Sequence, residues 1–134
     1  MTKAELKDLV YRVNGAAIEV HRILGPGLLE SVYHKCMKYE LTLRGIKYRS
    51  EMVVPVHFKD MVVDTDLRCD LFIEDILVTE LKAAKKVEPI DEAILLTYMK
   101  LLGAPMGLMI NFHCTHLFSE GQKTYVNELY RRMD

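Results

Sequence analysis

The chain has 134 residues, of which 50% are hydrophobic and 28% charged, and its 18 Lys and Arg residues against 19 Asp and Glu residues give a formal charge of −1. A chain of this length and composition folds as one domain with a hydrophobic core, which excludes disordered, collagen-like and coiled-coil proteins. The near-neutral charge also excludes a strongly basic nucleic-acid-binding chain, so any bound nucleic acid must contact a local patch or a metal ion.

The sequence has no feature typical of secreted or membrane proteins. Cys36, Cys69 and Cys114 are odd in number, widely spaced and without a CxxC pair, which favours reduced thiols. The first residues alternate charged and apolar side chains, unlike a signal peptide, and no segment approaches the ~18 apolar residues of a membrane span. We expect a single cytoplasmic domain over residues 1–134 that contacts no membrane.

The first half of the chain predicts two helices. Apolar residues at three- and four-residue steps indicate an amphipathic helix from Lys3 to Leu24. Gly25-Pro26-Gly27 ends this helix, because proline lacks the N–H that a helix needs and glycine tolerates a turn. A second helix is expected over Leu28 to Arg44, and Gly45 is a typical C-terminal cap.

After Gly45 the pattern changes to short apolar or alternating runs, which predict a strand meander. These runs cover residues 52–58, 61–63, 67–73 and 76–82. Pro89 opens a third helix over Ile90 to Leu102, and Met106 to Phe112 predicts a strand buried inside the sheet. Residues 124–130 fit either an edge strand or a short helix. The predicted order is α-α-β-β-β-α-β, an α/β fold with a mixed sheet flanked by helices.

Asp70, Glu80 and Lys82 are the residues best suited to metal chemistry. Alternating side-chain directions place Glu80 and Lys82 on one face of the strand over residues 76–82. Mg²⁺ and similar cations bind one or two carboxylates together with waters and substrate phosphate. Such a cation lowers the pKa of a bound water, and the lysine would orient that water or contact the phosphate.

The turn after Asp70 provides a geometric test of this hypothesis. A two-residue turn at Glu74-Asp75 would pair Asp70 with Thr79 and place it on the face opposite Glu80. A shared metal site therefore predicts a connection with an odd number of residues, or a bulge. On these three residues alone we favour the other interpretation, a solvated strand face with alternating charges, because short motifs have low specificity.

Motifs elsewhere in the chain favour the metal site over the solvated strand face. Residues 27–33 form a G-x-x-E-x-x-Y string in which Glu30 and Tyr33 lie on one helix face. Further motifs follow in order: Leu43-Arg44-Gly45-Ile46, Asp70, Glu80-Leu81-Lys82-Ala83, Glu92-Ala93 and Ile110-Asn111-Phe112. Together they closely resemble the GxxExxY protein family of the PD-(D/E)XK nuclease-like superfamily, from about residue 4 to at least residue 112.

The resemblance implies a restriction-endonuclease-like core and a metal-dependent nuclease that hydrolyses DNA or RNA. Asp70 and Glu80 would bind Mg²⁺ or Mn²⁺, with Glu30 and the main-chain carbonyl of Leu81 as further ligands. Lys82 would contact the attacking water or the phosphate. The implied reaction is phosphodiester hydrolysis with in-line attack of water on phosphorus, in which all three acids and the lysine count as catalytic.

Supporting roles are expected for several neighbouring residues. Lys85 and Lys86 precede a helix N-terminus, a natural phosphate-binding position, although a solvated loop has the same pattern. Tyr33 would pack its helix onto the sheet and hydrogen-bond a site carboxylate. His34 is expected on the helix surface or in support of Glu30.

Two differences from the family pattern keep a second function open. Ile94 stands where relatives carry a glutamine, and Asp91 stands where a histidine is frequent; isoleucine cannot donate a hydrogen bond to phosphate or water. The alternative is a catalytically weak or inactive nuclease-fold domain that serves as a nucleic-acid or protein interaction module.

A third hypothesis is a structural protein that dimerises through its first helix or sheet edge. For the isolated domain we expect weak nucleic-acid binding, with a second copy or another protein supplying specificity.

Overall fold

The computed structural model, which describes residues 1–134, places the first two helices close to their predicted positions. Helix α1 spans Lys3–Leu24 and helix α2 spans Glu30–Leu43. Thr2 caps α1, because its hydroxyl accepts a hydrogen bond from the Glu5 N–H while the Glu5 carboxylate accepts one from the Thr2 N–H. Gly45 follows α2 with φ at 71°, a left-handed conformation that glycine adopts without strain, as its predicted capping role requires.

Five strands form a mixed sheet in the order β1-β4-β5-β6-β7. The strands are β1 (Tyr48–Val53), β4 (Arg68–Ile73), β5 (Leu77–Lys82), β6 (Met106–Asn111) and β7 (Gln122–Val126). Strands β5 and β6 run parallel and are connected through helix α3 (Pro89–Leu102), whereas the other neighbours are antiparallel. All six residues of β6 are buried inside the sheet, as predicted.

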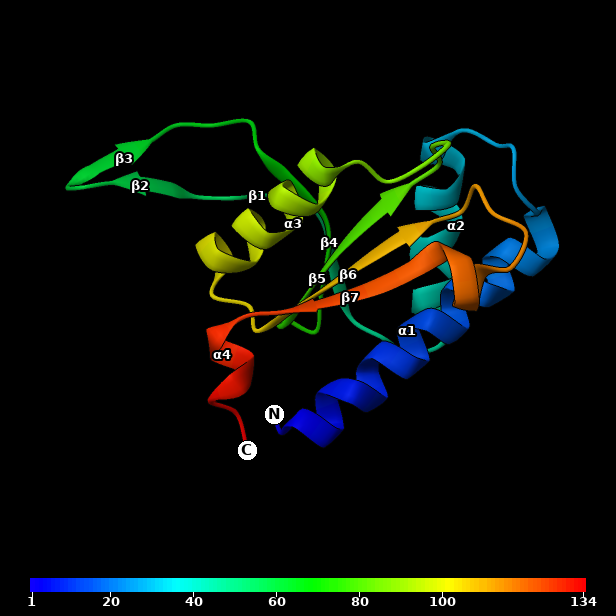
Figure 1. Ribbon diagram of the computed structural model, residues 1–134, viewed down its shortest axis with the longest axis horizontal. Helices are drawn as coiled ribbons and strands as arrows, with labels where there is room; N and C mark the ends of the chain where they lie inside the picture. Colours follow the sequence, from blue (N-terminus) through cyan, green and yellow to red (C-terminus); the bar gives the residue numbers. More distant parts are fainter.

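The structure corrects one predicted strand and resolves the segment that the sequence left undecided. The expected continuous strand over residues 52–58 is wrong: it is broken before β2 (Val56–Phe58) at Pro55, which has no N–H for a strand ladder. β2 pairs only with β3 (Met61–Val63), and the two form an arm that projects from the body of the protein (Figure 1). Residues 124–130, which fitted either an edge strand or a short helix, contain both: they include the end of edge strand β7 and the start of helix α4 (Glu128–Arg131). A π-helical turn over Leu117–Gly121 precedes β7.

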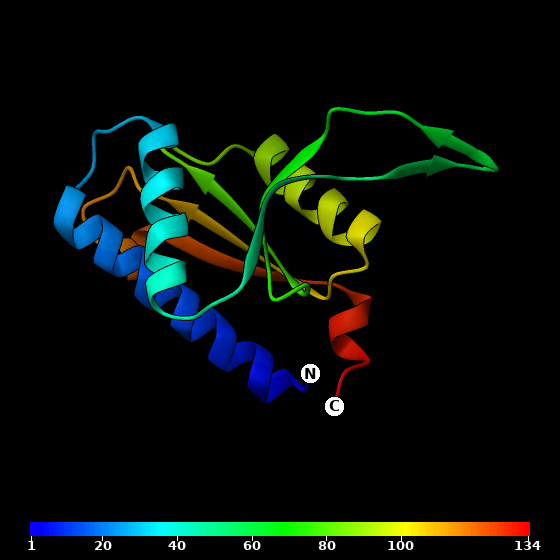
Figure 2. The same ribbon diagram turned by 180° about the vertical axis from the view of Figure 1, so that it is seen from behind.

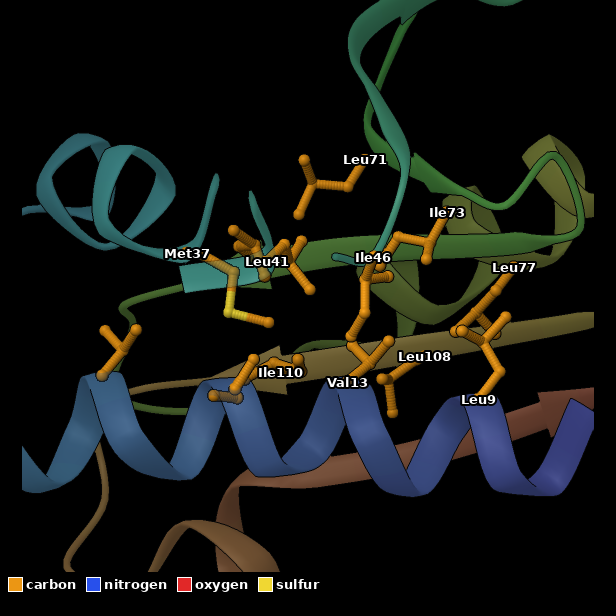
Figure 3. Close-up of a cluster of buried hydrophobic side chains, with 14 of the residues drawn as sticks. Leu9, Val13, Met37, Leu41, Ile46, Leu71, Ile73, Leu77, Leu108 and Ile110 are labelled. Carbon is orange, nitrogen blue, oxygen red and sulfur yellow. The ribbon is translucent and has the colours of Figure 1, made fainter. Parts of the chain in front are cut away.

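Helices cover both faces of the sheet and create two hydrophobic clusters. Helices α1 and α2 lie on one face and α3 on the other (Figures 1 and 2). The larger cluster packs α1 and α2 against inward residues such as Leu71 and Leu77 (Figure 3). The smaller one packs α3 against Phe72 and Val78, the residues next along β4 and β5. This alternation confirms the predicted faces of β5.

The ends of the chain lie side by side in both views (Figures 1 and 2). The N–H of Lys3 donates a hydrogen bond to the carbonyl of Asp134 at 2.8 Å. None of the helices combines the length and the apolar composition needed to cross a membrane. The three cysteines are free thiols.

Two glycines should respond in opposite ways to substitution by alanine. At Gly121 a Cβ atom would lie 2.6 Å from the backbone oxygen of Asn111, so we expect Gly121→Ala to destabilise the protein by about 1–3 kcal/mol. At Gly15, inside α1, the nearest atom is the end of the flexible Arg44 side chain, and Gly15→Ala should stabilise the helix by up to about 1 kcal/mol. Urea denaturation measures both changes, and equal effects of the two substitutions would contradict this packing.

Candidate active site

The turn between β4 and β5 determines which side chains of the two strands meet. Residues 74–76 connect Ile73 to its pairing partner Leu77, so the connection has three residues. The first two have left-handed backbones, with φ of 52° and 56°, as in a tight hairpin turn, and the third is an additional residue. The register therefore shifts by one position, and its continuation places Asp70 opposite Glu80. This is the odd-numbered connection that a shared carboxylate site requires.

The ladder between β4 and β5 separates at these two carboxylates. Its last paired residues are Leu71 and Thr79. Beyond them the Asp70 N–H donates to Oε2 of Glu80 at 3.0 Å, and the Leu81 N–H donates to Oδ2 of Asp70 at 2.8 Å. Side-chain oxygens thus replace backbone carbonyls as the acceptors, and each carboxylate retains a second oxygen that these bonds do not use.

Strand β1 is distorted on the other side of Asp70. The register of β1 against β4 is the same before and after Glu51 but skips this residue, whose φ is 52°. A left-handed backbone costs a residue with a Cβ atom about 1–2 kcal/mol, and such conformations concentrate at functional sites. Nη1 of Arg68 donates to the Glu51 carbonyl at 3.2 Å and stabilises the distorted segment.

A pocket of about 420 Å³ lies where the strands separate, between α2 and α3. Its lining consists of Glu30, Ser31, His34, Arg68, Asp70, Glu80, Lys82, Ile94 and Tyr98. The fold therefore brings all four predicted catalytic side chains to one pocket. Glu30 comes from the first turn of α2, Asp70 from β4, and Glu80 and Lys82 from β5.

The carboxylates of the pocket lack sufficient positive charge around them. Burial raises the pKa of Glu80 to about 9, and the neighbouring Asp70 carboxylate contributes to the increase. Burial also raises the pKa of Glu30, although the Lys82 ammonium opposes this shift. A buried carboxyl group beside another acid needs either a proton or a cation. Glu80 therefore holds a proton at neutral pH, and a bound cation would replace it.

Lys82 faces the carboxylates and the start of α3. Its Nζ lies 3.7 Å from Oδ1 of Asp91, while Oδ2 of Asp91 accepts a hydrogen bond from the Glu88 N–H at 2.9 Å. Asp91, a position of difference from the family pattern, therefore caps α3 and pairs with Lys82. Tyr98 lines the same pocket, and burial raises the pKa of its phenol, with a smaller contribution from Glu80.

Tyr33 lies away from the carboxylates and has a structural role. It is fully buried and stacks on Phe112, with ring centroids 4.5 Å apart. Its hydroxyl donates to the Gly25 carbonyl at 2.5 Å and accepts from the Leu28 N–H at 3.2 Å. The prediction that Tyr33 packs α2 onto the sheet is confirmed. The predicted hydrogen bond to a site carboxylate is wrong, because the hydroxyl instead joins the connection between α1 and α2.

Lys85 and Lys86 line a neighbouring pocket of about 450 Å³ rather than the carboxylate pocket. The loop that carries them is held by the Asn111 side chain, which accepts from the Ala84 N–H and donates to its carbonyl. Nζ of Lys86 lies 3.9 Å from Oε1 of Glu88. The structure therefore places both lysines outside the carboxylate pocket.

Several pocket residues received no catalytic role from the sequence. Arg68 lies two positions before Asp70, so the alternation of strand side chains could have placed it on the same face. His34 follows Glu30 by four residues, a spacing that puts both on one face of α2. Tyr98 carried no comparable signal, because its helical spacing is equally typical of a core residue.

The donor set fits a divalent cation such as Mg²⁺ or Mn²⁺. Carboxylate oxygens are the ligands these ions prefer, and Asp70 and Glu80 offer two that no backbone donor uses. The Phe112 N–H donates to the Lys82 carbonyl, so the carbonyl of the preceding residue, Leu81, faces β4. No three His, Cys, Asp or Glu side chains of the chain gather closely enough to enclose an ion. Binding would therefore need side chains of the pocket to move together.

The comparisons agree with this architecture. The model of the PD-(D/E)XK nuclease superfamily matches residues 7–124, which is most of the chain. Curated proteins and solved structures give no significant match. Members of the superfamily typically use divalent metal ions, in agreement with the carboxylates gathered between β4 and β5. The chain belongs to the PD-(D/E)XK nuclease superfamily.

Proposed function

We propose that this protein is a metal-dependent nuclease that hydrolyses phosphodiester bonds of DNA or RNA. The observation that supports it best is the separation of β4 and β5, where the Glu80 carboxylate accepts from the Asp70 N–H and the Asp70 carboxylate accepts from the Leu81 N–H. Glu30 and Lys82 line the same pocket. Structural packing alone gives no reason to place the buried Glu80 carboxylate beside the half-buried Asp70. The G-x-x-E-x-x-Y string of residues 27–33 supports the narrower assignment to the GxxExxY family.

The carboxylates would hold the cation. Asp70, Glu80, Glu30 and the Leu81 carbonyl are the proposed ligands of Mg²⁺ or Mn²⁺, which when bound lowers the pKa of a water and offsets charge on the phosphate oxygens. The backbone donors on Asp70 and Glu80 fix the orientation of both side chains. Asp70 and Glu80 are therefore oriented before substrate binds, and the cation would draw the remaining side chains of the pocket towards them.

Cationic side chains would bind and orient the phosphate. Lys82 projects into the pocket beside the carboxylates, where its ammonium would donate to a phosphate oxygen or orient the attacking water. Arg68 lines the same pocket and offers further donors. Lys85 and Lys86, in the neighbouring pocket, would contact phosphates along the strand.

Substrate affinity of the isolated domain is expected to be weak. The formal charge of −1 provides little general attraction for nucleic acid. We therefore propose that a second copy of the chain, or another protein, contributes specificity.

The alternative function is an inactive nuclease-fold module that binds nucleic acid or protein. It is favoured by Ile94, an apolar residue in the pocket lining with 38% of its surface exposed, and by the pairing of Lys82 with Asp91. Neither feature removes a proposed metal ligand. We therefore place the nuclease first.

Replacing Asp70 by Asn tests the proposal. We expect wild-type protein with Mn²⁺ to cleave labelled DNA or RNA, in single- or double-stranded form, and Asp70→Asn to lose at least about 100-fold in rate, because a charged ligand is removed. Mn²⁺ should also raise the melting temperature of the wild type but not that of Asp70→Asn. The control is Asp75→Asn, the same change in the exposed turn after β4.

Each outcome of this experiment has a distinct meaning. Equal cleavage by the wild type and both variants would indicate a contaminating nuclease. Metal-dependent stabilisation without cleavage would favour the inactive module, and neither cleavage nor stabilisation would reject the metal site.

A further inference from the structure

His34 has an unused nitrogen in the wall of the carboxylate pocket. Its side chain is only 14% exposed, it lines the pocket, and Nε2 is buried without a hydrogen-bond partner. Buried polar atoms are nearly always paired in folded proteins, so an unpaired one beside a pocket indicates a missing partner. We take this partner to be a group bound in the pocket, which a small movement of the ring would bring within reach of Nε2.

The other ring nitrogen of His34 faces an acid. Nδ1 lies 3.9 Å from Oε1 of Glu51, an ion-pair separation that the exposed Glu51 side chain can shorten by turning. A histidine that donates Nδ1–H to a carboxylate presents the Nε2 lone pair, and this carboxylate–histidine arrangement is typical of metal-binding histidines. Glu51 is held in place by its left-handed backbone and by the bond from Arg68 to its carbonyl.

The charged residues that line the pocket favour a cation as the partner of Nε2. Glu30, one helical turn before His34, lines the same pocket together with Asp70 and Glu80. The formal charge of the pocket lining is −1, from these three acids against Arg68 and Lys82. A neutral imidazole lone pair in such surroundings would bind a cation already attracted by the carboxylates.

We propose that His34 is an additional metal ligand, which gives this site a preference for first-row transition ions such as Mn²⁺ over Mg²⁺. Mg²⁺ takes oxygen ligands and retains water, whereas imidazole nitrogen binds first-row transition ions more strongly. The inference rests on the proposed function, because it assumes that the carboxylates of the pocket hold a divalent cation.

The test is spectroscopic and requires no cleavage assay. Electron spin-echo spectroscopy of Mn²⁺-loaded wild-type protein should show coupling to ¹⁴N, and selective ¹⁵N-histidine labelling should change that signal. His34→Gln should abolish the coupling and weaken Mn²⁺ binding by about 10-fold or more, while Mg²⁺ affinity changes less than about 2-fold. The control is His57→Gln, on the projecting β2–β3 arm, which should leave the coupling unchanged.

A second variant guards against misfolding of His34→Gln. Glu51→Gln alters only an exposed side chain, and we expect it to retain the ¹⁴N coupling but to weaken Mn²⁺ binding, because Nδ1 loses its charged acceptor. Mn²⁺ binding that depends on Asp70 but shows no ¹⁴N coupling would overturn the role of His34 alone. Absence of Mn²⁺ binding to the wild type would overturn both this inference and the proposed function.

Discussion

Replacing Glu80 by Gln is expected to stabilise the metal-free protein at pH 7 by about 1–3 kcal/mol while abolishing its response to metal. Glu80 is 6% exposed, and burial together with the Asp70 carboxylate raises its pKa from 4.5 to about 9. A shift of one pKa unit corresponds to about 1.4 kcal/mol, so an ionised Glu80 is costly in the folded state. Glutamine keeps the shape and can still accept from the Asp70 N–H.

The effect should depend on pH in a defined direction. Because the pKa of Glu80 is higher in the folded than in the unfolded state, its contribution to stability is fully present below about pH 4.5 and is lost as the pH rises towards 9. The stability advantage of Glu80→Gln should therefore be small at acidic pH and increase with pH. Urea denaturation in EDTA across this range measures it.

The control for Glu80→Gln is Glu128→Gln, the same change on exposed helix α4. It should show little pH-dependent difference from the wild type, and it should keep the stabilisation by Mn²⁺. Lower stability of Glu80→Gln than of the wild type at pH 7 and 9 would contradict a destabilising charge at this position. Retained Mn²⁺ stabilisation in that variant would remove Glu80 from the proposed ligands.

Replacing Lys82 by Met should reduce cleavage by about 100-fold or more while leaving Mn²⁺ binding largely intact. The lysine is proposed to act on the phosphate or the water, and loss of one such charged donor typically costs a factor of 10²–10³ in rate. Methionine retains the length and apolar part of the side chain. Cleavage rates at saturating Mn²⁺, measured beside Mn²⁺ affinity, separate the two effects.

Asp91→Asn provides the matched comparison for Lys82. It removes the negative partner 3.7 Å from Nζ of Lys82, but asparagine can still accept from the Glu88 N–H and cap α3. We expect less than about a 10-fold change in rate, because the ammonium itself remains. Equal losses in the two variants would show that the ion pair at the start of α3, rather than the lysine itself, is what cleavage requires.

Local patterns accounted for much of the fold because they depend on neighbouring residues. The apolar spacing of α1 predicted its bounds, since one face of a helix repeats every three or four residues. The alternation along β5 correctly placed Glu80 and Lys82 on one face, opposite Leu81. Whether a hairpin joins the main sheet depends on contacts with distant segments, so the sequence did not show that β2 and β3, which residues 59–60 connect, form a separate arm.

The sequence by itself determined the helices, the faces of the strands and the residue types of a nuclease-like site. Only the tertiary structure decided that residues 74–76 shift the β4–β5 register, that Asp70 meets Glu80, and that α2 brings Glu30 and His34 to the same pocket. The reason is physical: side-chain direction within one element follows from backbone geometry, whereas the meeting of separate elements depends on the packing of the whole chain. The formal charge of −1 describes the whole chain and argued against general nucleic-acid binding. It did not reveal that three acids, Glu30, Asp70 and Glu80, line one pocket.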